Sequence, residues 1–428
     1  MKVRKIKDII RFSVIGFNII ALVFLLNACN DKPTDIGYSL IQDTVNTKTL
    51  TSIDSAFIIS HSNSFIIRDT LFNKGALFVG KSENMKAVSM LRFAFIPDSL
   101  SYVTSADIDS VSLILPVNKY VYGDTVNKSS MSFRVYKIKQ DWSNKTTWDI
   151  VYPGGSQSSS YFDETKTLAS FNAPIIDTIP VISIPLDKEL LVDWFQLAKD
   201  TVSRKSIYGI ALVPDESSTS IRSLAAISYS SSASHPTIKV YFKNKSNARD
   251  SAILGSGIDY YIVNNTLPND SSMTVQGAVY IRSKIDIDLS KQYSNDVRLI
   301  PDLSAIHSAS LELTLDSVNS NVGNSVFDST LYAILYRDSL NGKSLSTYYA
   351  SRSKTDKSKY TFHNITSAIE HWVKTGIKKG SLVITIEGLN EDRSLNKLKF
   401  YGNNEIDKTK RPKLNIIYST RPKPNNKK

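Results

Sequence analysis

The chain has 428 residues, a formal net charge of +12 and a single cysteine, which excludes a framework of disulfides within the chain. Each end carries a net +4, in residues 1–11 and 421–428, and this leaves only +4 for the remainder. Such a diluted charge, without an arginine-rich helix or a basic aromatic patch, argues against a nucleic-acid partner. The length exceeds one typical core, so it favours two or more domains.

Residues 1–28 are predicted to be a signal peptide. After the basic start, residues 12–26 are apolar except for Ser13, Gly16 and Asn18. A membrane-spanning helix needs about 20 apolar residues. A basic start, a shorter apolar stretch and a small residue before the cut are instead typical of an export signal. The alternative is an uncleaved anchor with an incidental cysteine.

The end of this segment, Leu-Asn-Ala-Cys at residues 26–29, resembles a bacterial lipobox, although Asn27 stands where Ala or Ser is commoner. The resemblance implies that the Cys29 thiol is alkylated by diacylglycerol, that the chain is cut before it, and that the new amine is acylated. Each acyl chain contributes about 0.8 kcal/mol per buried methylene to membrane attachment. Residues 29–50 then form a tether. Residues 29–41 are similar to the start of mature surface lipoproteins of Bacteroidetes-type bacteria. We expect an outer-membrane location, on either the periplasmic or the surface-exposed side.

The mature chain repeats itself in sequence. Residues 190–242 and 367–418 each contain a short apolar helix pattern around a tryptophan, Trp194 or Trp372, followed by a strand and a last strand led by proline. Upstream, Val111, Leu113 and Leu115 correspond to Leu311, Leu313 and Leu315, in the period-2 alternation of a half-buried strand. We therefore expect a tandem duplication.

Most of each repeat consists of short β-branched or aromatic runs between turn residues. The sequence predicts an all-β fold of two tandem jelly-roll-like β-sandwiches, each with one short tryptophan-containing helix. The expected boundaries are 51–243 for the first sandwich, 244–251 for a linker, 252–419 for the second and 420–428 for a basic tail.

Three sequence patterns resemble nucleotide-binding or metal-binding sites but are better explained as structural or surface residues. Gly75–Ser82 fits the phosphate-loop pattern, yet its central residues are those of a buried strand that ends in a turn. The five histidines have no metal-ligand spacing. Two acidic pairs at strand spacing could help to hold calcium, but a solvent-facing role is favoured because no acidic loop with its glycine is present. The pairs are Asp107 with Asp109 and Asp286 with Asp288. We predict no enzyme, metal, cofactor or nucleotide.

The aromatic content, with 21 tyrosines and 4 tryptophans, is the remaining functional signal. Sugars stack their apolar faces on aromatic rings. Trp142 and Trp148 flank a polar Ser-Asn-Lys-Thr-Thr stretch, and Tyr120 and Tyr122 lie upstream. These four residues are the candidate glycan-binding residues, although aromatic side chains also suit strands and cores.

The order of elements over roughly residues 55–243 is similar to the DNRLRE-type domain, a secreted β-sandwich grouped with carbohydrate-binding modules. The resemblance is carried by the succession of 73–95, 105–115, 135–148, 191–214 and 235–242. The literal DNRLRE string is absent. The second repeat lacks the Asp-Trp-Ser-Asn-Lys-Thr-Thr-Trp element, so the resemblance implies glycan binding in the first repeat only.

These observations lead to two hypotheses about function. The first is a non-catalytic envelope lipoprotein that binds extracellular or cell-wall glycan through its first sandwich, with the second acting as a scaffold. The second is a structural or adhesive envelope lipoprotein whose sandwiches act as spacers or dock other proteins. The expected partners are the membrane, through the lipid, and a polysaccharide or an envelope protein. Exposure of the candidate rings distinguishes the two hypotheses.

Overall fold

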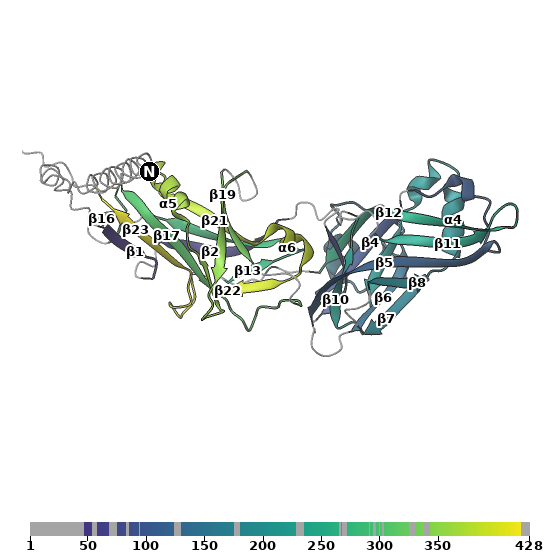
Figure 1. Cartoon of the computed structure of the whole chain (residues 1–428), viewed down its shortest axis with the longest axis horizontal. Helices are drawn as coiled ribbons and strands as arrows, with labels where there is room; N and C mark the ends of the chain where they lie inside the picture. The colour runs from purple at the N-terminus through teal and green to yellow at the C-terminus, as the bar shows by residue number, and fades with distance from the viewer. Residues whose placement is uncertain are drawn as a thin grey trace, which may run out of the picture. The chain divides into compact units, whose positions relative to one another are not determined.

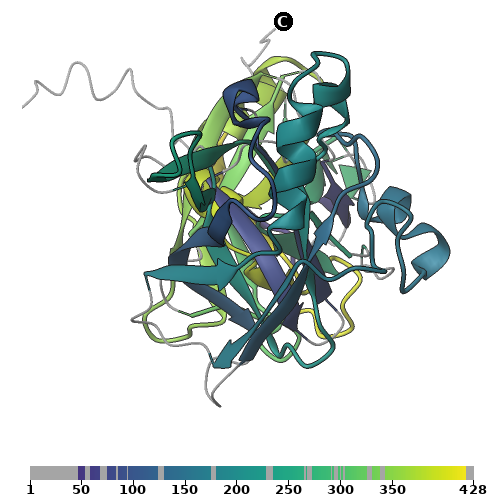
Figure 2. The same cartoon turned by 90° about the vertical axis from the view of Figure 1, so that its right-hand side faces the viewer.

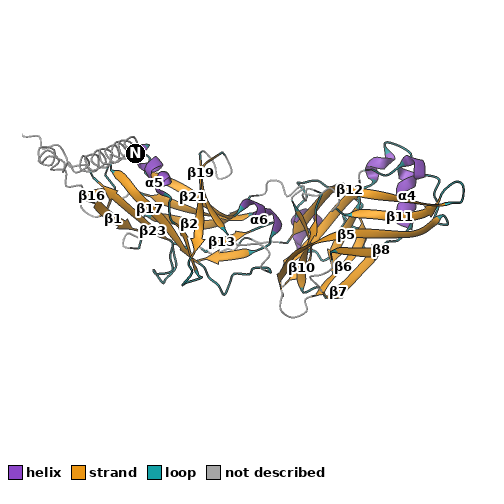
Figure 3. Cartoon of the chain, in the orientation of Figure 1, coloured by secondary structure: helices purple, strands orange, loops and turns teal. Residues whose placement is uncertain are grey.

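The structure is a computed structural model, and its two β-sheets dominate the chain (Figures 1 and 3). It describes residues 47–53, 58–67, 75–82, 85–93, 95–123, 130–174, 180–227, 235–264, 267, 272–290, 292–293, 297–298, 300–301, 304–324, 330–337 and 343–420. The predicted signal peptide, Cys29 and the tail after residue 420 lie outside these residues. Residues 49–418 form one compact unit, and the fold is given for that unit.

The first sandwich is a ten-stranded antiparallel sheet in the order β12-β11-β5-β10-β3-β4-β9-β6-β7, with β8 added to β5. Its strands are β3 (Ala76–Ser82), β4 (Met85–Phe93), β5 (Ile108–Gly123), β6 (Ser130–Lys137), β7 (Ala169–Pro174), β8 (Val181–Pro185), β9 (Ile210–Pro214), β10 (Ser220–Ala225), β11 (Thr237–Lys243) and β12 (Arg249–Val263). The two longest strands fold the sheet over its core, because β5 pairs with both β11 and β10, and β12 pairs with both β11 and β4.

Alternation of side chains decides which face of each strand is buried. In β11, Ile238, Val240 and Phe242 are buried while Lys239 and Tyr241 point away. Helix α4 (Glu189–Leu197) covers part of the same core and is the upright teal helix of Figure 2. Its Trp194 packs against Phe93 of β4 with ring centroids 5.7 Å apart. Four short elements complete this part: η1 (Asp98–Leu100), α3 (Trp148–Val151), η2 (Pro153–Gly155) and η3 (Ser203–Ser206).

The second sandwich is an eleven-stranded antiparallel sheet in the order β1-β23-β17-β20-β19-β18-β21-β14-β13-β22, with β2 added to β14. Its strands are β1 (Thr47–Thr51), β2 (Ile59–Ile66), β13 (Met273–Gln276), β14 (Ile281–Asp288), β17 (Ala305–Thr314), β18 (Leu331–Tyr336), β19 (Ser344–Arg352), β20 (Lys359–Phe362), β21 (Lys379–Ile386), β22 (Lys397–Phe400) and β23 (Lys413–Ser419). A small sheet pairs β15 (Gln292–Tyr293) with β16 (Val297–Arg298). The helices are α5 (Thr366–Lys374) and α6 (Gly388–Arg393).

The all-β prediction, with a short tryptophan helix in each half, is confirmed. Trp194 lies in α4 and Trp372 in α5, and both are buried. The phosphate-loop look-alike is also a strand, as expected, because Ala76–Ser82 forms β3 and pairs with β10. No helix among the described residues is long and apolar enough to cross a membrane.

The strand pairing places the boundary between the sandwiches differently from the prediction. The expected linker at 244–251 is a hairpin turn and the start of β12, because Asn244 and Ala248 close a turn and Lys243 pairs with Arg249. The prediction was wrong because the polar residues of this hairpin turn have the composition of a linker between domains. The strand that follows them, β12, belongs to the first sandwich. Conversely, β1 and β2 precede the first sandwich in the chain but pair within the second.

Candidate functional site

Tyr120 and Tyr122 do not form an exposed platform. Both rings are buried in the core of the first sandwich. The Tyr120 ring contacts Phe78 edge-on, and its hydroxyl is held by Asn396 and by the backbone N–H of Leu395. Rings covered in this way cannot stack on a sugar, so their proposed role in glycan binding is corrected. The end of β5 is covered on both of its faces, which the alternation pattern does not reveal.

Trp142 is also buried and has structural partners. Its indole Nε1–H donates to the carbonyl of Tyr208 at 2.8 Å. The Arg92 guanidinium lies 5.0 Å from the ring centroid, and the Tyr260 ring lies 6.2 Å away at an angle of 22°. These contacts occupy the ring, so Trp142 anchors its loop and is not available as a sugar platform.

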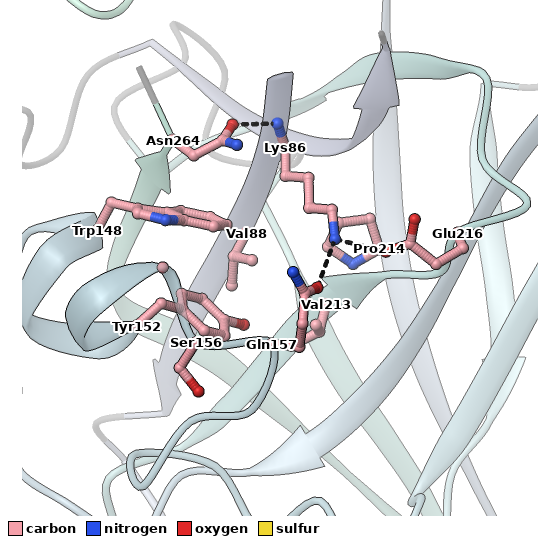
Figure 4. Close-up of a pocket in the computed structure, with 11 residues that line it drawn as sticks. Lys86, Val88, Trp148, Tyr152, Ser156, Gln157, Val213, Pro214, Glu216 and Asn264 are labelled. Atoms are coloured by element: carbon pink, nitrogen blue, oxygen red, sulfur yellow. Dashed lines mark hydrogen bonds and ion pairs between the residues drawn. The ribbon is translucent and has the colours of Figure 1, made fainter. Parts of the chain in front are cut away.

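Trp148 is the one candidate ring that lines a cavity. It is half-buried at the start of α3, and its ring lies 4.5 Å from that of Tyr152, tilted by 31°. Tyr152 is buried beneath it, and this burial raises the pKa of its hydroxyl above the usual value. Figure 4 shows both rings on one side of the cavity. The Trp148 ring therefore has a rigid aromatic support.

The cavity beside Trp148 has a volume of about 200 Å³. A cavity of about 150 Å³ is large enough to hold a six-membered ring such as benzene, so this cavity has room for one sugar ring. Its walls are formed by β4, β9, α3 and the segments that follow α3, β9 and β12. Its lining residues are Lys86, Val88, Trp148, Tyr152, Gly155, Ser156, Gln157, Val213, Pro214, Glu216 and Asn264.

The wall opposite the two rings is polar and charged (Figure 4). The Lys86 ammonium pairs with the Glu216 carboxylate and lies 3.4 Å from Oε1 of Gln157, and Lys81 pairs with the same carboxylate. Hydrogen bonds from Lys81 and then Lys86 lower the pKa of Glu216 to about 2. Two lysines against one carboxylate leave this wall with one net positive charge.

Sequence reasoning found Trp148 but missed the polar wall. Lys86 and Glu216 are 130 residues apart, and Asn264, whose Oδ1 accepts from the Lys86 backbone N–H, is 178 residues from Lys86. They meet because β12 pairs with β4 and β4 pairs with β9. No local sequence motif indicates that these three strands lie side by side.

The acidic pairs considered for calcium have protein partners. Asp107 accepts from the backbone and hydroxyl of Thr104, and Asp109 lies 3.8 Å from Arg249. Asp288 pairs with Lys379 at 3.3 Å. Asp286 accepts from the Ser381 hydroxyl and pairs with Lys284 at 3.0 Å. Within the part of the chain that the structure describes, no group of three His, Cys, Asp or Glu side chains could hold a metal ion.

Comparison with known proteins gives little further guidance. No family model and no curated protein matches the chain. A cryo-EM structure of the T=1 Penaeus vannamei nodavirus aligns over 82% of this chain and 97% of its own, at 13% identity and a TM-score of 0.13. A similarity at that level has no bearing on fold or function, so the functional argument depends on the site alone.

Proposed function

We propose that this protein is an exported, lipid-anchored and non-catalytic protein of the bacterial envelope that binds a glycan in the cavity beside Trp148. The observation that carries the proposal is the arrangement of that cavity, in which a supported indole ring faces Lys86, Gln157 and Glu216. An apolar ring face and convergent hydrogen-bonding groups are what a sugar ring requires. The export and the lipid anchor depend on the lipobox resemblance.

The size of the cavity indicates what part of a glycan enters it. Room for one sugar ring, and burial of the other three candidate aromatic residues, suit recognition of a single residue better than an extended chain. One ring contact contributes about 1 kcal/mol beyond area burial. We therefore expect weak binding, with a Kd of about 10 micromolar to 1 millimolar.

The test is calorimetric titration of the full mature chain with mono- and oligosaccharides from cellulose, xylan, alginate and host-type glycans. Trp148→Ala should weaken binding about tenfold or more, which corresponds to about 1.4 kcal/mol. Tyr241→Ala is the matched control, because Tyr241 lies on the outer face of β11 between Lys239 and Arg249, away from the cavity. Binding that survives Trp148→Ala unchanged would reject the site.

A structural or docking role is the second candidate, and burial of Tyr120, Tyr122 and Trp142 favours it. The hydroxyl of Tyr261, in β12, also donates to the carbonyl of Ala278 at 2.6 Å, so an aromatic residue of the first sandwich ties it to a segment of the second. A protein that only spaces or docks partners would bury its rings in this manner. Absence of glycan binding by the wild-type chain would support this function.

The non-enzymatic part of the proposal has its own test. The purified chain should leave the same polysaccharides intact over prolonged incubation, as judged by the release of reducing ends. Hydrolysis that is lost when one carboxylate is changed would overturn it.

A further inference from the structure

The outer face of strands β18 and β19 in the second sandwich exposes a tyrosine cluster. Leu331, Ala333 and Leu335 of β18 point into the core, so Tyr332 and Tyr336 lie on the opposite face. Tyr349 of β19 pairs directly with Tyr332 and is 65% exposed. Figure 1 labels β19 and β21, and β18 lies between these two strands in the sheet.

Tyr332 and Tyr349 form a corner of two rings. Their centroids are 4.7 Å apart, and the ring planes meet at 74°. Glu387 follows β21, and its backbone N–H donates to the carbonyl of Thr330 at 2.9 Å, two residues before Tyr332. Burial, followed by the nearby Glu387 carboxylate, raises the pKa of the Tyr332 hydroxyl above the usual value. The corner therefore joins two aromatic rings to a carboxylate on a surface that solvent reaches.

The charge of this corner is negative. Arg282, on β14 at the far edge of β21, is held by Glu391 through two contacts of 2.8 Å, so its charge is neutralised there. The Glu387 carboxylate accepts a hydrogen bond from the neutral side-chain amide of Asn390 at 3.2 Å. Among the described residues, no lysine or arginine pairs with Glu387. Within the described ranges, one carboxylate beside two rings thus has no cation as an ion-pair partner.

Aromatic rings and a carboxylate attract the same kind of ligand. The faces of tyrosine rings attract an ammonium group by about 0.5–1 kcal/mol at an exposed site, and an uncompensated carboxylate adds Coulombic attraction. We propose that the Tyr332–Tyr349–Glu387 corner is a second carbohydrate-binding site, which takes sugars bearing a free amino group. It differs from the Trp148 cavity, where two lysines outnumber one carboxylate and repel such a sugar.

This inference depends on the proposed glycan-binding function and extends it to the second sandwich. A sugar is favoured over an isolated amine because the same ring pair offers an apolar stacking face and hydroxyls at its edge. The second sandwich lacks the segment that carries Trp148 in the first, but these tyrosines provide an aromatic stacking surface of their own. The second sandwich is then a binding element in its own right.

The test titrates the full mature chain with two matched oligosaccharides, a β-linked glucosamine tetramer and its fully N-acetylated counterpart. They share the same backbone and linkage and differ at the C2 nitrogen, which at mildly acidic pH is a protonated amine in the first and an uncharged acetamide in the second. We expect the glucosamine tetramer to bind about three- to tenfold more tightly. Tyr349→Ala should abolish this preference, Glu387→Gln should reduce it, and Tyr349→Phe should keep most of it. Tyr241→Ala should leave it unchanged.

The outcomes separate this inference from the proposed function. Preferential binding that Trp148→Ala leaves intact and Tyr349→Ala removes supports the second site. Equal affinity for the two tetramers, or a preference that survives Tyr349→Ala, overturns it even when Trp148 is needed for another glycan. A wild-type chain that binds no glycan overturns both proposals. A lysine-rich peptide that competes better than the glucosamine tetramer would assign the corner to protein ammonium groups and also overturn the sugar assignment.

Discussion

The Tyr120 hydroxyl, in the first sandwich, donates to Oδ1 of Asn396, next to β22 of the second, at 2.8 Å and across 276 residues of sequence. The same hydroxyl accepts from the Leu395 backbone N–H at 2.9 Å, and Oδ1 of Asn396 accepts from Gly323 N–H at 2.8 Å. Tyr120, Leu395 and Asn396 are buried, so the hydrogen bonds among them replace bonds to water that burial has removed. A residue that looked like a ligand platform is in fact a link between the sandwiches.

Tyr120→Phe should destabilise the protein by about 1–3 kcal/mol, because it removes the acceptor of a buried N–H while keeping the ring. Denaturant unfolding of the full chain measures the change. Tyr241→Phe is the control, since Tyr241 is at the surface, and it should change the unfolding free energy by less than about 0.5 kcal/mol. An equal effect of the two substitutions would contradict the linking role.

Gly380→Ala should destabilise the second sandwich. A methyl group at residue 380 would come within 1.9 Å of the Trp372 indole, so α5 or β21 must shift. Such overpacking costs about 1–3 kcal/mol. The melting temperature and the tryptophan fluorescence of the folded protein should both change. Gly388→Ala is the control, because a methyl group there would meet no atom within 4 Å apart from its neighbours in the chain and its own helix backbone. Identical melting of the two variants would be inconsistent with this packing.

The buried carboxyl of Asp259 should make stability depend on pH. Burial raises its pKa from 3.8 to about 6, although it accepts a hydrogen bond from the Ile227 N–H. Between these two pKa values the folded state binds more protons than the unfolded state, so the unfolding free energy falls as pH rises from about 4 to 6, by on the order of 2 kcal/mol.

Asp259→Asn should remove this fall. The measurement is denaturant unfolding of the wild-type chain and the variant on both sides of the window, and the quantity compared is the difference between them, because other groups also titrate. The variant should gain stability relative to the wild type as pH rises. A difference that does not depend on pH would show that the carboxyl titrates normally.

Cys29 should carry lipid in the native host. Mass spectrometry of the purified N-terminus should find an acylated cysteine as the first residue, and Cys29→Ala should move the protein from the membrane to the soluble fraction. An intact Met1 terminus would rule out the predicted cleavage. This prediction depends on the sequence alone, since Cys29 lies outside the described residues.

The sequence was sufficient for features that local periodicity determines. The helices around Trp194 and Trp372 were predictable because each buries one side at helical spacing. The strand at Ala76–Ser82 was predictable because it begins with a short apolar run, which is buried on both faces. Burial of Tyr120 and Tyr122 was not, because the second layer that covers them comes from distant parts of the chain.

The candidate sites show the same limit. Trp148 stood out as an aromatic residue beside polar neighbours, but Lys86 and Glu216 reach it only through strand pairing. The corner of Tyr332 and Tyr349 also requires the register of β18 against β19, which places the two side chains opposite each other. A shift of one residue would send one ring into the core.

The early strand β2 has a consequence for how the protein is made. Its partner β14 is synthesised after the whole first sandwich. Similarly, the hydroxyl oxygen of Ser52, directly after β1, accepts a hydrogen bond from the backbone N–H of Leu414, which is synthesised 362 residues later. The first sandwich can therefore assemble from one continuous stretch of chain, whereas the second cannot close until its last strand is available. Premature termination anywhere before β23 would leave β1 without its neighbour, exposing an unpaired edge to aggregation and to quality-control proteases.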